Sequence, residues 1–131
     1  ERVYGRAVVA ADAGVKGRRA AVDDDAADAC AVAAHELGQR LLEGLQSLKE
    51  FSFVGDVRGL GLVCGVEIVS SKETKTADPV MTMKIFKAAQ ERGLRSRPLG
   101  NTLAFSPPLS ITEDEVDEII KRLGAAMDGV A

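Results

Sequence analysis

Two arginines, Arg95 and Arg97, have the best-defined chemistry of any side chains in this sequence. They share one face of a short predicted strand that leads into a Pro-Leu-Gly turn. A guanidinium group in a cleft can hold a carboxylate through two parallel hydrogen bonds. The alternative is a pair of exposed charges on an edge strand, which would contribute little to stability. The spacing alone leaves both alternatives open.

The other reactive residue types form no recognisable catalytic or metal-binding group. His35 is the only histidine, lies among alanines on a predicted helix, and has no serine or cysteine at a catalytic spacing. We therefore expect a solvated helix residue and not a general base. One histidine and two separated cysteines, Cys30 and Cys64, cannot complete the ligand shell of a metal, so we expect no metal site and reduced thiols.

The composition is that of one globular domain. The chain has 131 residues, of which 46% are apolar, and this fits a compact unit with a hydrophobic core. The net charge is −3, from 17 basic and 20 acidic residues, so we expect no nucleic-acid partner. No apolar run approaches the ~20 residues that span a bilayer, so we expect no membrane partner. Reduced cysteines favour a cytoplasmic location.

The spacing of the apolar residues predicts the order helix, one or two strands, helix, two strands, helix. The helices are expected at residues 29–50, 79–92 and from 113, and the strands at residues 57–69, 94–98 and 102–106. The apolar stripe of the first helix consists of Leu37, Leu41, Leu45 and Leu48. Gly38 and Gly44 lower the helix propensity of the same segment. The order predicts an α/β (α+β) fold, a two-layer sandwich in which helices cover one face of a small, mostly antiparallel sheet.

The glycine-rich segment at residues 57–69 is predicted to be β structure and not a nucleotide-binding loop. Its spacing differs from G-x-G-x-x-G, and a strand follows the glycines where that motif needs a helix. One face of the segment is apolar, and it consists of Leu60, Leu62, Cys64, Val66 and Ile68. Because the segment is longer than a usual strand, we expect a bend or bulge near Gly61 or Gly65.

Two helix starts carry clear capping signals. Asp78 followed by Pro79 is typical of the first residues of a helix. Thr112 and Glu115 have the spacing of a capping box. The acidic residues 113–115 then lie at the positive end of a helix, which explains them better than a carboxylate pair for acid–base chemistry.

Residues 1–34 differ in character from the rest of the chain. They are rich in alanine, which buries little apolar surface, so we predict an arm that is disordered or in part helical. The predicted division is therefore an arm at residues 1–34 and a domain at residues 35–131.

Three blocks of the sequence resemble the C-terminal small domain of class III aminotransferases, which are pyridoxal-phosphate enzymes of fold type I. The blocks are G-D-V-R-G-L-G at residues 55–61, E-R-G-L at residues 91–94 and F-S-P-P-L-S-I-T-E-D-E-V-D-E-I at residues 105–119. Their order and spacing agree with the family. Residues 1–34 lack the family's motif that places a threonine on the cofactor phosphate.

The resemblance implies one site residue in this chain. Arg97 aligns with the family's mobile arginine, which grips the substrate carboxylate in the omega-amine and amine–pyruvate subgroup. Ala104 stands where ornithine-type members have a second arginine, so Arg97 is the remaining anchor. The implied reaction moves an amino group from an amine or omega-amino acid to a keto acid such as pyruvate.

The resemblance also implies what this chain lacks and which partners it needs. In the complete enzyme, pyridoxal phosphate is held by a lysine and an aspartate of a large domain, and neither is found here. We therefore expect no catalytic residue, no cofactor-binding residue and no cofactor bound by this chain alone. The expected partners are that large domain, a second subunit of a homodimer, and the small-molecule amine and keto acid. Two alternatives stay open: a non-catalytic truncated remnant, or a free-standing α/β ligand-binding or dimerisation module.

Overall fold

The computed structural model describes the backbone of residues 24–131. The helices are α2 (Asp24–Ser47), the short 3-10 helix η1 (Leu48–Glu50), α3 (Pro79–Glu91) and α4 (Glu113–Val130). The strands are β1 (Val54–Leu60), β2 (Val63–Ser71), β3 (Thr76–Ala77), β4 (Arg97–Leu99) and β5 (Thr102–Phe105). The predicted order of elements holds except between the first two helices, where the short strand β3 follows β1 and β2 and makes three strands instead of one or two.

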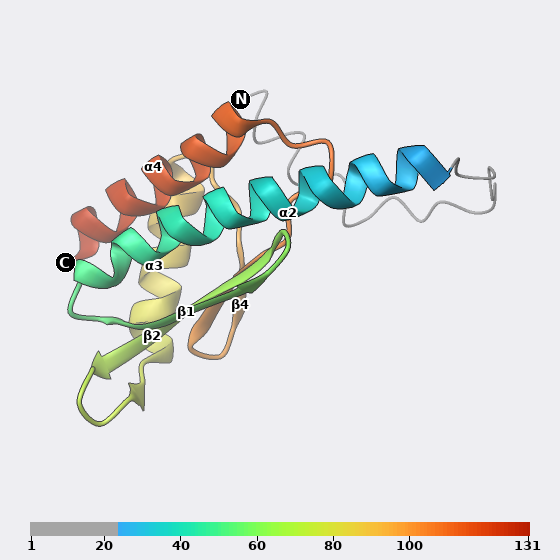
Figure 1. The fold of residues 1–131 in the computed structure, drawn as a ribbon. Helices are drawn as coiled ribbons and strands as arrows, with labels where there is room; N and C mark the ends of the chain where they lie inside the picture. The colour runs from blue at the N-terminus through green and yellow to red at the C-terminus, as the bar shows by residue number, and fades with distance from the viewer. Residues whose placement is uncertain (1–23) are drawn as a thin grey trace.

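The strands form one antiparallel sheet, and the helices lie on one side of it (Figure 1). The order across the sheet is β1-β2-β5-β4, with β3 paired to β2. The row formed by Val57, Val66 and Leu103 is buried under the helices. The predicted two-layer sandwich with a mostly antiparallel sheet is therefore confirmed.

The segment predicted as one long strand is a hairpin of β1 and β2. Gly61, with φ of 58°, stands in the turn between them, so the expected bend is a full reversal of the chain. The reversal restarts the alternation of faces. Leu60 is consequently 88% exposed, and its predicted place on the buried face is wrong, whereas Leu62 and Cys64 are buried as predicted.

The two glycines of the first helix are contact points of α2. A Cβ atom at Gly38 would lie 2.1 Å from the carbonyl oxygen of Gly61, so α2 crosses directly over the hairpin turn. A Cβ atom at Gly44 would lie 1.8 Å from Cδ1 of Ile120 on α4. Both positions weaken the isolated helix but allow it to approach its neighbours closely.

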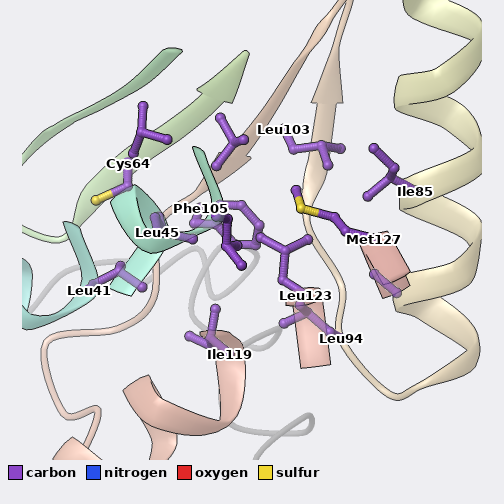
Figure 2. Packing of buried hydrophobic residues seen from close by; sticks show 14 of the residues in the cluster. Leu41, Leu45, Cys64, Ile85, Leu94, Leu103, Phe105, Ile119, Leu123 and Met127 are labelled. Carbon is purple, nitrogen blue, oxygen red and sulfur yellow. The ribbon is translucent and has the colours of Figure 1, made fainter. Parts of the chain in front are cut away.

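The core lies between the sheet and the three long helices. Figure 2 shows apolar side chains from α2, α3, α4, β2 and β5 gathered in one cluster. The labelled members are Leu41, Leu45, Cys64, Ile85, Leu94, Leu103, Phe105, Ile119, Leu123 and Met127. Leu41, Leu45 and Leu48 of the predicted stripe are buried here, while Leu37 packs against the cluster and is partly exposed.

The predicted helix caps are present. Asp78 caps α3, since its Oδ1 atom accepts a hydrogen bond of 2.9 Å from the backbone N–H of Met81. Thr112 caps α4, and its hydroxyl oxygen accepts a hydrogen bond of 3.3 Å from the backbone N–H of Glu115. The first residues of α3 and α4 are thereby set by local sequence signals.

The strand predicted at residues 94–98 begins only at Arg97. The reason lies at the end of α3, where Gly93 has φ of 78° and the N–H of Leu94 reaches back to the carbonyl of Ala89 at 2.9 Å. Leu94 is therefore part of the helix termination and its side chain enters the core. The strand starts after this turn is complete.

Part of the predicted arm lies outside the described residues. Residues 1–23 are not described, and residues 24–34, for which a partly helical arm was one of the predictions, form the first turns of α2. The helix thus starts at Asp24, earlier than the predicted residue 29, and its alanines favour that extension. This first part projects beyond the sheet (Figure 1).

Candidate functional site

Four residues form one straight row across the sheet, on the face that the helices leave uncovered. Arg58 of β1 lies opposite Gly65 of β2, and Gly65 lies opposite Ala104 of β5. Ala104 in turn lies opposite Arg97 of β4. Directly opposite residues project to the same face of a sheet. The row therefore has an arginine at each end and a floor of two small residues.

Arg97 is the first residue of β4, and its side chain is exposed. Within residues 28–131, no carboxylate forms an ion pair with it and no hydrogen bond holds its guanidinium group. Ala104 beside it has a small side chain that is half-buried. The structure thus places the predicted carboxylate anchor where an external anion can reach it.

Arg95 does not join Arg97 in this row. It precedes β4, outside the paired residues of the ladder, and is exposed. The predicted strand would have put both arginines on the same face of the sheet. Because the turn after α3 extends through Leu94, only Arg97 is held by strand pairing.

Arg58 and Glu67 form an ion pair on the same face of the sheet. The Nη2 atom of Arg58 lies 3.4 Å from Oε2 of Glu67, and the two side chains are 62% and 20% exposed. Glu67 lies opposite Thr102, and Thr102 lies opposite Leu99, which is two residues after Arg97. This is the next row of side chains on the same face of the sheet. Sequence reasoning missed this pair, although Arg58 belongs to the G-D-V-R-G-L-G block, because strand register joins residues nine positions apart.

The other candidate residues are separate from the row. His35 is exposed on α2, as predicted, and residues 113–115 form the first turn of α4. Cys30 is exposed, whereas Cys64 is buried, and its burial raises the pKa of the thiol. In the described part of the chain, no three residues among His, Cys, Asp and Glu are grouped as metal ligands. None of the helices there is long and apolar enough to cross a bilayer.

The sequence model of the class III aminotransferases matches residues 22–127, which is most of the chain. The chain belongs to the class III aminotransferase family. The matched region begins upstream of residue 35, where the sequence analysis placed the start of the domain, and that boundary stays a prediction.

Curated relatives of this aminotransferase chain are several times longer than the chain itself. The adenosylmethionine-8-amino-7-oxononanoate aminotransferase of Methanocaldococcus jannaschii is 45% identical over 75 residues, which is 55% of this chain and 16% of that protein. A probable gamma-aminobutyrate transaminase 3 of Oryza sativa is 36% identical over 95 residues, 70% of this chain and 19% of that protein. The chain therefore spans less than a quarter of these relatives.

Solved structures of transaminases share the fold. A thermostable omega transaminase variant from Pseudomonas jessenii superposes with a TM-score of 0.75 at 33% identity, over 80% of this chain and 24% of that structure. The omega transaminase of the same organism in complex with PMP also gives 0.75, at 34% identity, over 79% of this chain and 24% of that structure. Pyridoxal phosphate is accordingly the cofactor of the family.

The lysines among the described residues do not lie in the surroundings usual for a cofactor-binding lysine. Every lysine among them is exposed, whereas a lysine that condenses with a carbonyl group is usually desolvated. Lys84 and Lys87 line a shallow hollow of about 440 Å³ on α3 together with Pro79, Val80 and Met83. That hollow contains no carboxylate that could pair with the pyridine nitrogen. That the lysine and aspartate for the cofactor lie elsewhere in the complete enzyme stays a prediction.

Proposed function

We propose that this chain supplies the substrate-facing small domain of a pyridoxal-phosphate transaminase. In this proposal Arg97 holds the carboxylate of a keto acid such as pyruvate, and the amino donor is an amine or omega-amino acid. The observation that carries the proposal is the exposed guanidinium of Arg97, which has no partner among the described residues and stands beside the small floor of Ala104 and Gly65.

The physical reason lies in what a carboxylate gains at Arg97. A planar guanidinium group offers two parallel N–H donors that match the two oxygens of a carboxylate. On an open sheet this contact is weak, because water screens it. When a second domain closes over the sheet and excludes water, the same contact strengthens. Substrate binding by Arg97 therefore depends on closure.

The remainder of the enzyme is the proposed cover of this face. Leu60, Val63 and Leu99 are 88%, 62% and 52% exposed, and their strand positions put them on the same side as Arg97. Large apolar side chains exposed on one face of a protein are typical of an interface. We propose that the large domain, which supplies the lysine and aspartate for the cofactor, packs here, and that two complete subunits form a homodimer.

The named relatives are compatible with this substrate class. One is called a gamma-aminobutyrate transaminase and another an alanine–glyoxylate aminotransferase, and gamma-aminobutyrate, alanine and glyoxylate all carry a carboxylate. The superposed structures are called omega transaminases. An arginine that binds the carboxylate of either the amino donor or the keto acid is compatible with the substrates in these names.

The test uses a hybrid enzyme, in which residues 35–131 of this chain replace the matching segment of the Pseudomonas jessenii omega transaminase. When bound, the cofactor supplies the carbonyl group that takes up and returns the amino group. We expect the hybrid to transfer an amino group to pyruvate and to lose this activity selectively in Arg97→Ala. A hybrid that folds and binds its cofactor but uses pyruvate equally well without Arg97 would overturn the proposal.

A further inference from the structure

The uncovered face has two arginines but only one uncompensated positive charge in the row described above. Neighbouring strands are about 4.8 Å apart, so Arg58 and Arg97, which are separated by three such steps, have Cα atoms about 14 Å apart. Between them lie only Gly65 and Ala104. Both guanidinium groups therefore border the same open floor, and a ligand on that floor lies within reach of either.

Glu67 neutralises the charge of one of these arginines, Arg58. Its carboxylate lies 3.4 Å from the guanidinium of Arg58 and is the less exposed partner, at 20% against 62%. A partly buried carboxylate needs a nearby positive charge more than an exposed arginine needs a negative one. Arg58 is thus held by Glu67, whereas Arg97 has no such partner among the described residues.

We propose that Glu67 restricts this site to substrates with one carboxylate group, and this inference rests on the proposed function of Arg97. The first carboxylate of a substrate pairs with Arg97. A second carboxylate on the same floor meets an arginine that is already neutralised, and it also meets the negative charge of Glu67. Glu67 is therefore a specificity residue that does not itself bind the favoured substrate.

The inference predicts what removal of that charge does. In Glu67→Gln the side chain keeps its size and its place on β2, but Arg58 loses its charged partner. Two free guanidinium groups then border the floor, and a dicarboxylate can engage both. One charge-assisted hydrogen bond in a closed cleft corresponds to about a tenfold change in affinity.

The experiment compares two five-carbon keto acids in the hybrid enzyme, so that chain length is matched. The substrates are 2-oxopentanoate, with one carboxylate, and 2-oxoglutarate, with two. The measured quantity is the ratio of their kcat/KM values. We expect Glu67→Gln to shift this ratio about tenfold toward 2-oxoglutarate. The double variant Glu67→Gln/Arg58→Met, which keeps an apolar stem of similar length, should return the ratio to its original value.

Arg95→Ala is the matched control, because Arg95 is an exposed arginine outside the paired row, and it should leave the ratio unchanged. An unchanged ratio in Glu67→Gln would overturn the inference. A shift that persists in the double variant would also overturn it, since Arg58 would then have no part. Arg97→Ala distinguishes a failure of the proposed function from a failure of the inference about Glu67. If Arg97→Ala spares both keto acids, the proposed function fails. If it weakens the use of both while Glu67→Gln changes nothing, only the inference fails.

Discussion

Arg40 on α2 and Asp117 on α4 are joined by two parallel hydrogen bonds. The Nε and Nη2 atoms of Arg40 donate to the two carboxylate oxygens of Asp117 at 2.9 and 2.8 Å. Both side chains are largely exposed, so the pair contributes little to stability through Coulomb energy alone. Its fixed planar geometry instead helps to set the position of α2 along α4, and with it the crossing of α2 over the hairpin that carries Arg58.

This pair predicts a specific loss of stability in acid. The hydrogen bonds from Arg40 lower the pKa of Asp117 below its ordinary value. A carboxyl group with a lowered pKa in the folded state stabilises the fold above its unfolded pKa of about 3.9, and this stabilisation is lost as the pH falls through the folded value. We expect wild type to lose more stability than Asp117→Asn between about pH 5 and pH 2.

Urea unfolding midpoints at several pH values measure this difference. Asp128→Asn is the control, since Asp128 is exposed on the same helix and forms no ion pair among the described residues. Parallel pH curves for wild type and Asp117→Asn would contradict the predicted pH dependence.

The crossing of α2 over the hairpin predicts opposite effects of two glycine-to-alanine substitutions. A Cβ atom at Gly38 would lie 2.1 Å from a backbone oxygen, which cannot move without shifting the hairpin. We expect Gly38→Ala to destabilise the fold by about 1–3 kcal/mol despite the better helix propensity of alanine. At Gly124 on α4 the nearest atom would be Cδ2 of Leu48 at 3.5 Å, an ordinary contact. Gly124→Ala should therefore stabilise by up to about 1 kcal/mol, and equal thermal shifts for the two variants would contradict the close crossing.

The exposed apolar residues of the open face predict association of the isolated chain. Leu60 and Leu99 lie on the face that we assign to the large domain, and they stay exposed without it. We expect concentration-dependent self-association that decreases in the double variant Leu60→Ser/Leu99→Ser. Val32→Ser, at an exposed apolar residue on α2 away from this face, should have no effect. Sedimentation velocity measures this, and a monomer at all concentrations in wild type would argue against an interface on this face.

The parts of the fold that depend on neighbouring residues could be predicted from the sequence. The caps at Asp78 and Thr112 and most of the leucine stripe of the first helix were confirmed, because each depends on residues within a few turns. The hairpin at Gly61 was missed because apolar residues alternate without interruption through the turn. Only the pairing of β1 with β2 shows that Leu60 ends the first strand and that Leu62 lies in the turn before the second.

The site was predictable only in part, for the same reason. Arg97 was found through its place after the E-R-G-L block, and its role as a carboxylate anchor stays a prediction. The Arg58–Glu67 pair depends on the register of β1 and β2, which no local pattern reveals. The prediction that Arg95 lies beside Arg97 on one strand is wrong, because the termination of α3 takes up Leu94 and shortens the strand.

The most direct test of the account is the effect of Arg97→Ala on the two half-reactions of the hybrid enzyme, each measured as kcat/KM. A charge-assisted pair in a closed cleft is worth about 1.5–3 kcal/mol, so the half-reaction with pyruvate should slow roughly ten- to a hundredfold. The half-reaction with an amine that has no carboxylate should change little, and Arg97→Lys should restore only part of the pyruvate rate, because lysine lacks the planar fork. Equal losses with pyruvate and with the amine would contradict the account, since Arg97 would then support the fold and not bind the substrate.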